Sequence, residues 1–321
     1  MHMADALVSP AVAGVAGAAA VALIAVSSSK VKNIKREDII PLMGVLGAFV
    51  FAAQMINFSI PGTGSSGHII GGILLSALIG PWAGFLTLCS VLIIQCLVFA
   101  DGGMMALGCN IVNMAAMSCL VAAPLVYRPI AGEGKSVLRI TVASIAASIV
   151  GLELGAILVT LETELSGITA LPAKEFLGLM TSIHLAIGAI EGVATAVVLS
   201  FVANYKPEIL YSAQSGSAVP DGKKGIGRKA RIVMGSFLGA ALVMAIGFTW
   251  LASENPDGLE WSIAKLTGDT EIGVATIPST AIMPDYDSSF AGVVGGVIVM
   301  VMLWCICALL FRKRKACRKV N

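Results

Sequence analysis

Long apolar stretches recur along almost the whole chain and decide what it can fold into. Their approximate ranges are 8–27, 39–57, 67–80, 82–100, 103–127, 137–161, 175–203, 231–252 and 290–311. Most are long enough to cross a hydrocarbon core of about 30 Å as a helix. The stretch at 67–80 is short and ends at Gly80-Pro81. We count it as a span because the predicted topology needs one additional crossing in this part of the chain. We therefore predict an all-α polytopic membrane protein with nine spans.

The composition indicates the same class. Hydrophobic residues make up 57% of the 321 residues, charged residues 12%, and the mean hydropathy is +0.91. Soluble globular proteins have roughly 25% charged residues. A chain so poor in charge cannot cover its surface with side chains that water solvates, so soluble and disordered proteins are excluded.

The distribution of Lys and Arg predicts the orientation. If the N-terminus lies outside, 19 of the 21 basic residues fall in inner loops and the C-terminal tail, and only Lys174 and Lys265 fall outside. Loops with an excess of basic residues lie on the cytoplasmic side of a membrane. We expect a multi-pass protein of the inner cell membrane, in contact with its lipids, with an external N-terminus and a cytoplasmic C-terminus.

A polar and basic stretch over 206–230 divides the apolar pattern. Its Gly, Ser and Pro content is typical of a linker, and the predicted orientation makes it cytoplasmic. It separates a seven-span unit over 1–205 from a two-span unit over 231–321. The two-span unit encloses an external segment over 253–289 with seven acidic residues.

The N-terminus, MHMADALVSP, is the sharpest chemical feature. The α-amine of Met1, the amide nitrogen of His2 and its Nδ1 can close two fused chelate rings and fill three corners of a square. Ni(II) and Cu(II) accept square-planar nitrogen ligands, whereas Zn(II) prefers a tetrahedron. This N-terminus is not a secretory signal peptide, since it has an acid and no Lys or Arg. Methionine aminopeptidase removes Met1 only before small residues, so we expect Met1 to keep its free amine.

His68 is the candidate for the fourth corner. It lies in the Gly-rich loop SIPGTGSSGHIIGG over 59–72, which the predicted orientation puts on the same side as Met1. A single loop histidine is often merely solvated or hydrogen-bonded. Beside an intact Met1-His2 end, we favour the role of a ligand.

Four segments together resemble the M component, the substrate-capture component of nickel/cobalt energy-coupling-factor transporters. They are MHMADALVSP, PGTGSSGHIIGG, IIQCLVFADGGMMALGCNIVNM over 93–114 and HLAIGAIEG over 184–192. The resemblance covers about residues 1–205, and PDGLEWS over 256–262 resembles the accessory N subunit, here fused to M. It implies a six-helix core with an extra first helix that carries the N-terminus into an outward-facing site. The metal ligands of the family map onto Met1, His2 and His68.

Polar side chains inside apolar segments are costly and are functional candidates. Those in the recognised segments are Gln95, Asp101, Asn110, Asn113, His184 and Glu191. His184 and Glu191 are seven residues apart, so they share one helix face. We suggest that some of these groups hydrogen-bond the ligating imidazoles and fix their tautomer; the alternative is interhelical hydrogen bonding without any link to metal. Asp5 lies close enough in sequence to orient His2.

The leading hypothesis is high-affinity capture of Ni(II) as a transported substrate, with no catalytic cofactor. Co(II) by the same mechanism is the alternative, although the start MHMAD resembles the nickel branch of the family more closely. The chain is not predicted to be an enzyme: GEGKS over 132–136 fails as a phosphate-binding loop because Pro129 stands where its first glycine is needed.

The resemblance implies that partner ATPase (A/O) subunits hydrolyse ATP and that a transmembrane coupling (T/Q) subunit transmits the effect of this hydrolysis to the capture component. No nucleic-acid partner is expected. A second hypothesis is a secondary divalent-cation transporter that works alone. Glu153 and Glu191 are few charges for such a mechanism. A membrane enzyme would need a catalytic motif, and neither HExxH nor GxSxG occurs.

Overall fold

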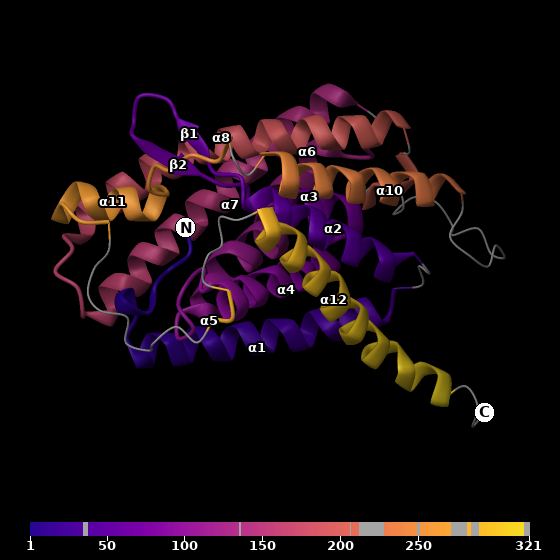
Figure 1. The fold of residues 1–321 in the computed structure, drawn as a ribbon, viewed down its shortest axis with the longest axis horizontal. Helices are drawn as coiled ribbons and strands as arrows, with labels where there is room; N and C mark the ends of the chain where they lie inside the picture. The colour runs from indigo at the N-terminus through magenta and orange to yellow at the C-terminus, as the bar shows by residue number, and fades with distance from the viewer. Residues whose placement is uncertain are drawn as a thin grey trace.

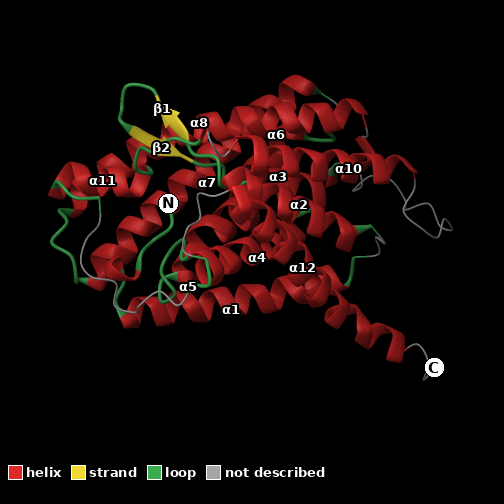
Figure 2. Ribbon diagram, viewed as in Figure 1, coloured by secondary structure: helices red, strands yellow, loops and turns green. Residues whose placement is uncertain are grey.

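The computed structural model describes residues 1–34, 38–134, 136–205, 207–211, 228–248, 251–270, 281–283 and 289–317. Helices dominate, and most of them lie along the long axis of the molecule, with a two-stranded hairpin near one end (Figures 1 and 2). Most of the predicted linker, residues 206 and 212–227, lies outside the described residues, as do 271–280 and 284–288 of the predicted external segment.

The elements of the first unit follow one another in the order of the apolar stretches. They are η1 (Asp5–Leu7), α1 (Pro10–Lys32), α2 (Ile39–Gln54), β1 (Phe58–Ile60), β2 (Ser65–Gly67), α3 (Gly72–Ile79), α4 (Pro81–Phe99), α5 (Leu107–Asn110), η2 (Ile111–Tyr127), α6 (Arg128–Ala131), α7 (Val137–Ser166), α8 (Ala173–Tyr205) and η3 (Pro207–Ile209). The elements of the second are α10 (Arg228–Val243), η4 (Met244–Phe248), α11 (Gly258–Thr267) and α12 (Ser289–Cys317).

Six described helices are long and apolar enough to cross a membrane. They are Pro10–Lys32, Pro81–Phe99, Leu107–Ala131, Val137–Ser166, Ala173–Tyr205 and Phe290–Ala308. Two more apolar helices, Ile39–Gln54 and Arg231–Gly247, are shorter. The chain is thus a multi-pass membrane protein built as a seven-helix unit followed by a two-helix unit, with α11 as an additional short helix.

The predicted span at 67–80 is much shorter than expected. Its helix, α3, has 8 residues and is about 12 Å long, too short to cross a membrane alone. Gly80 ends it with a φ of 87°, a conformation that glycine adopts without strain, and Pro81 starts α4 at once. The residues before α3 form β2 and the loop that carries His68.

Small residues let the longest helices approach one another. On α8, a Cβ at Gly188 would lie 2.9 Å from the Cα of Ile149, and one at Gly192 would lie 2.4 Å from the Cα of Ile145. Both neighbours are on α7, so the α7–α8 contact depends on these glycines. Helices α7 and α8 thus pack closely against each other beside the N-terminal segment.

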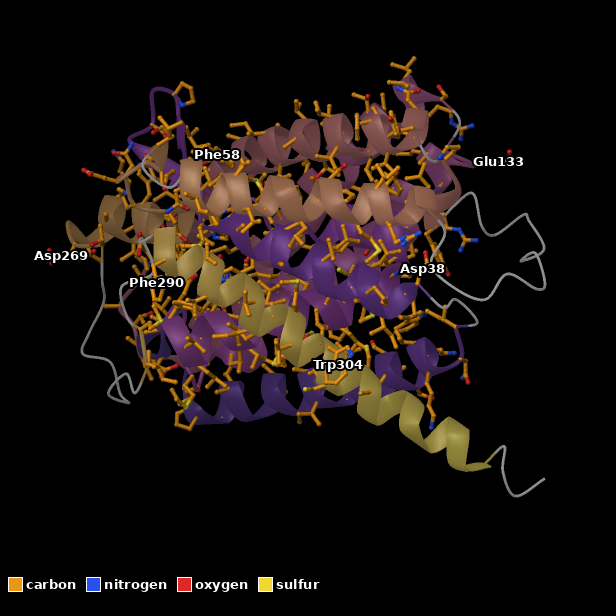
Figure 3. All side chains as sticks on the ribbon, turned by 45° about the vertical axis from the view of Figure 1, so that its right-hand side comes forward. Asp38, Phe58, Glu133, Asp269, Phe290 and Trp304 are labelled. Atoms are coloured by element: carbon orange, nitrogen blue, oxygen red, sulfur yellow. The ribbon has the colours of Figure 1, made fainter. Side chains whose placement is uncertain are left out.

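The second unit packs along the first. Helices α10 and α12 both contact α2, and α12 also contacts α4. Helix α11 lies apart from them, against α8 and β2. In Figure 1 the N-terminus, the hairpin and α11 lie at one end of the molecule, and the C-terminus lies at the other. Figure 3 likewise places Phe58 and Asp269 at one end and Asp38 and Glu133 at the opposite end.

Candidate metal site

The N-terminal segment runs into the interior of the molecule and is held there by its backbone. Met1 is 4% exposed and Met3 is fully buried. The Met3 amide donates to Asn110 Oδ1 at 2.8 Å, and Asn110 Nδ2 donates to the Met3 carbonyl at 3.2 Å. The Gly103 amide donates to the same carbonyl at 2.8 Å. These bonds fix the path of the residues that precede η1.

The three predicted ligands lie together at the buried end of this segment. The Met1 nitrogen is 3.5 Å from His68 Nε2. The rings of His2 and His68 are stacked, with centroids 5.1 Å apart and planes inclined by 17°. Four nitrogens of the predicted chelate, from Met1, His2 and His68, therefore belong to one compact buried cluster.

Two carboxylates hold two of these groups. The Met1 amine forms an ion pair with Asp257, the residue before α11. His2 Nδ1 lies 3.1 Å from Asp101 Oδ1. A metal ion that takes the amine and Nδ1 must displace both carboxylates from them.

Burial sets the charge states around the amine. Burial, reinforced by the positive charge of the N-terminus, lowers the pKa of His2 to about 3 and that of His68 to about 3. Burial alone raises the pKa of Asp257, but the charge and hydrogen bond of the N-terminal amine outweigh it and hold this pKa well below its ordinary value. At neutral pH both imidazoles are neutral and can offer a lone pair to a metal.

The loop that carries His68 is anchored by a carboxylate from a spanning helix. Glu191 on α8 accepts hydrogen bonds from the amides of Ile70 and Gly71, both at 3.0 Å. Gln54 at the end of α2 donates to the Ile70 carbonyl at 2.8 Å and accepts from Gln95 Nε2 at 2.6 Å. Glu191 thus holds the loop backbone, whereas Gln95 hydrogen-bonds both Gln54 and the His2 side chain.

The hairpin before His68 is tied to the second unit. Strands β1 and β2 are antiparallel, with Ser66 opposite Ser59. The Ser66 amide donates to the Pro256 carbonyl at 2.8 Å, and Trp261 Nε1 donates to the Thr63 carbonyl at 2.9 Å. The PDGLE segment therefore contacts both the hairpin that leads to His68 and, through Asp257, the N-terminal amine.

The remaining predicted residues have other partners. Asn113 donates to Glu162 Oε2 at 2.6 Å and contacts the Met3 sulfur at 3.5 Å. Asp5 Oδ1 accepts from the Ala106 amide at 3.0 Å and so holds the loop before α5. His184 Nδ1 lies 2.7 Å from the Met180 carbonyl.

A small cavity adjoins the cluster. Its wall contains Met1, His68, His184 and Asp257, and is completed by Gly67, Ile70, Leu152, Ile187 and Gly258. Among the described residues, no group of three or more His, Cys, Asp or Glu side chains has the arrangement of a metal site. Side chains alone thus make no site here, and the candidate ligands include main-chain nitrogens.

Sequence reasoning missed Asp257, which pairs with the Met1 amine, and Gln54, which holds the loop after His68. Asp257 was one of seven acids in the 253–289 segment, and its place in PDGLE was the available signal. Gln54 follows an apolar run, and a polar residue at the end of a predicted span was its only signal. Neither signal specifies a partner, because both contacts join segments far apart in the chain.

Comparison with known families identifies both parts of the chain. Residues 2–209 match the family CbiM, described as a cobalt uptake substrate-specific transmembrane region. Residues 231–312 match the PDGLE domain.

Relatives share this two-part organisation. A putative fused nickel transport protein NikMN of Archaeoglobus fulgidus is 32% identical over 94% of this chain and 96% of its own length. A fused nickel transport protein NikMN of Rhodobacter capsulatus is 28% identical over 95% of this chain and 86% of its own length. The similarity therefore runs through both units.

A solved structure has the same fold over the first unit. The crystal structure of a transition metal transporter superposes with a TM-score of 0.56 at 30% identity, covering 64% of this chain and 93% of that one. Sequence, fold and two-part organisation agree, and the chain belongs to the CbiM family of cobalt uptake substrate-specific transmembrane regions, joined here to a PDGLE domain.

Proposed function

We propose that this chain captures Ni(II) for uptake with four nitrogens in a square plane. They are the Met1 amine, the amide nitrogen and Nδ1 of His2, and Nε2 of His68. The observation that carries the proposal is the 3.5 Å distance from the Met1 nitrogen to His68 Nε2, inside a buried cluster that also holds the His2 ring.

The observed spacing is close to what the square requires. With metal–nitrogen distances of about 2.0 Å, as for histidine on zinc, neighbouring corners are about 2.8 Å apart. His68 would stand beside the amine and opposite the His2 amide. The Met1 nitrogen and His68 Nε2, which are 3.5 Å apart, therefore need to approach each other by about 0.7 Å.

The His2 ring has to turn when the ion binds. Ring nitrogens bind metals in the ring plane, and the stacked rings of His2 and His68 do not share a plane. Rotation about the Cα–Cβ bond of His2 would bring its ring plane to the ion, and a half-turn about the Cβ–Cγ bond would take Nδ1 away from Asp101 and bring Nε2 toward that side. Asp101 would then accept from Nε2–H, which orients the ring and keeps the lone pair on Nδ1.

Nickel is favoured over cobalt by two observations. Relatives that match 83% or more of this chain are named fused nickel transport proteins, although relatives that match shorter parts of it are named cobalt transport proteins. A plane of nitrogens that includes an ionised amide suits Ni(II). Co(II), held in the same way, is the alternative cargo.

The proposal includes partners and an orientation. No phosphate-binding loop is present in the sequence, so ATPase subunits and a transmembrane coupling subunit would drive release, as in energy-coupling-factor transporters. The positive-inside distribution supports an external N-terminus in the inner cell membrane. In this division, residues 1–205 capture the metal, 206–230 form a cytoplasmic linker, and 231–321 add Asp257 to the site.

The test is a two-residue extension, Ala-Pro, before Met1. A single added residue would place histidine third in the chain, where the amine, two amides and the imidazole could themselves bind Ni(II) in a square plane; proline has no amide hydrogen to lose and so prevents this chelate. His2, His68 and His184 are unchanged. We expect stoichiometric Ni(II) binding, measured by calorimetry and metal analysis of the purified chain, to fall by at least a hundredfold in affinity. Ala-Pro added after Asn321 is the matched control. Unchanged binding by the N-terminally extended chain would exclude the amine as a ligand.

Transport needs a separate experiment. In cells that express the whole transporter, inactivating the partner ATPase should abolish Ni(II) uptake. Undiminished uptake would indicate a secondary cation transporter that works alone.

A further inference from the structure

His184 is the histidine that the proposed chelate does not use, yet its side chain lines the same small cavity as Met1 and His68. Its side chain is buried on α8 with 1% exposure. It lines the small cavity whose wall also contains Met1, His68 and Asp257. The ring Cε1 lies at the first turn of α11, where a Cβ on Gly258 would come within 3.0 Å of it.

One hydrogen bond fixes the tautomer of this ring. His184 Nδ1 is 2.7 Å from the Met180 carbonyl, and a carbonyl oxygen can only accept. The neutral ring therefore has its hydrogen on Nδ1 and its lone pair on Nε2. Among the described residues, His184 Nε2 has no hydrogen-bond partner.

This pattern is that of a metal-binding histidine. Histidines that bind metal through one ring nitrogen almost always donate the other N–H to a carbonyl or a carboxylate. A buried nitrogen without a partner is costly, so a purely structural role for the ring would be better served by an apolar side chain. The cavity that His184 lines is also lined by Met1 and His68, two residues of the proposed chelate.

We propose that His184 is a transfer ligand, which takes the ion from His68 as it leaves the N-terminal chelate. This inference rests on the proposed function. The bond from the metal to His68 Nε2 breaks, and a bond to His184 Nε2 forms. Both donors are neutral nitrogens, so neither a proton nor an electron moves. A square-planar ion is open above and below its plane, where the entering nitrogen can approach.

The position of His184 gives the exchange a direction. Met1 and His68 lie on non-helical segments, whereas His184 lies on α8, a helix long enough to cross the membrane. After the exchange the ion has left the loop of His68 and is bound to a spanning helix, and only the Met1 and His2 nitrogens remain to be released. The same step in reverse would assist loading, so the rates of both processes should depend on His184, whereas the affinity should not.

His184→Asn is the diagnostic variant. Its side-chain amide can still donate to the Met180 carbonyl, but it has nothing at the position of Nε2. Thr195→Val is the matched control, because Thr195 is 2% exposed on the same helix and does not line the cavity. If the Asn variant does not fold, as judged from its melting temperature, His184→Leu replaces it, because an apolar side chain of similar size needs no partner and offers no lone pair.

The measurement is nickel exchange in the purified full-length chain. Ni(II) loading is followed by stopped flow through the visible absorbance of amide-bound Ni(II), and release by a challenge with excess EDTA. We expect His184→Asn to slow loading and release by the same factor of at least ten, with the Kd within twofold of wild type and Thr195→Val unaffected.

Two results would overturn the inference. Wild-type rates in His184→Asn would exclude a transfer role, and a weaker Kd with unchanged loading would make His184 an ordinary ligand of the resting ion. Failure of the proposed function looks different, since the wild-type chain itself would then bind no Ni(II).

Discussion

The N-terminal amine of Met1 is paired with the carboxylate of Asp257, which lies 256 residues further along the chain. The same carboxylate caps α11, where its Oδ1 accepts from the amides of Leu259 and Glu260 at 2.7 and 2.9 Å. The second unit therefore holds a group that the proposed chelate needs. The ion pair and a bound metal compete for one nitrogen.

Asp257→Asn should remove the ion pair with Met1 while keeping the N-cap of α11. Asn is as good an N-cap as Asp, so α11 keeps its start, but the buried amine loses its counter-charge. We expect the metal-free chain to lose about 1–3 kcal/mol of stability, because the pair is partly buried and its loss leaves the buried amine without a counter-charge. Saturating Ni(II) should shrink this difference, since the proposed metal-bound form lacks the pair in both proteins. Thermal unfolding with and without Ni(II) measures it.

Glu260→Gln is the control for this comparison. Glu260 belongs to the same capping box and accepts from the Asp257 amide at 3.0 Å, and Gln keeps an acceptor oxygen there. Its effect should be small and the same with and without Ni(II). Equal destabilisation of Asp257→Asn in both conditions would mean that the amine stays on the carboxylate when metal binds.

Glu191→Gln should weaken metal binding without removing a ligand. Glu191 accepts from two successive amides in the loop after His68, and Gln can accept with only one oxygen. Losing a hydrogen bond to a charged group costs about 1.5–3 kcal/mol and releases the loop. We expect the Ni(II) affinity, measured by calorimetry, to fall by about 10- to 100-fold. Glu153→Gln on α7 is the matched control, and an unchanged Kd in Glu191→Gln would show that the loop does not position His68.

Hydropathy predicted most of the helices, because a 20-residue apolar run has few alternatives in a membrane. It overestimated the stretch at 67–80, where the break depends on the backbone at Gly80 and on a hairpin too short to have a periodic pattern. Local sequence could not show this.

The chemistry of the N-terminus made Met1 and His2 candidates, the loop position of His68 on the same predicted side made it the third, and the resemblance implies the same three residues. Asp101 was one of six candidates for bonding the imidazoles, but which candidate contacts which ring could not be predicted, and Asp257 was not among them. The pairing of His2 with Asp101 depends on a ring rotation, and that of Met1 with Asp257 depends on how the two units pack. Apolar patterns and motifs specify segments, whereas these contacts arise only when distant segments meet.

Gly258→Ala should push the two units apart at the site. An added Cβ would lie 3.0 Å from both His184 Cε1 and Ile187 Cδ1, and 3.2 Å from Ile183 Cγ2, closer than almost any real contact. We expect a loss of about 1–3 kcal/mol in stability, typical of overpacking, as α11 moves off α8.

The matched substitution is Gly178→Ala. Gly178 lies on α8 with open space around its Cα, so the added methyl should instead stabilise the helix by up to about 1 kcal/mol. Thermal unfolding of both variants checks the contrast. If both behave alike, the close approach of α11 to α8 is not required.

Acidification below about pH 6.5 should destabilise the metal-free chain through its buried histidines, before Asp257 takes up a proton. The pKa values of His2 and His68 are about 3 in the folded protein and about 6.5 when unfolded. Between these values the unfolded chain binds more protons than the folded one, so the free energy of unfolding falls as the pH falls from 6.5 toward 3. Each histidine contributes at most about 1.4 kcal/mol per pH unit. Asp257, whose pKa is lowered, adds its own loss only below about pH 4.

The measurement is the melting temperature of the metal-free protein from pH 7 to pH 4.5, in wild type and in His68→Asn. The variant lacks one of the two buried imidazoles, so its curve should decline less steeply over this window. Asp257 cannot produce this difference, because its carboxylate remains ionised in the folded state throughout the window. Parallel curves for the two proteins would show that His68 takes up its proton as readily in the folded chain as in the unfolded one, and that its ring is not held neutral for a metal.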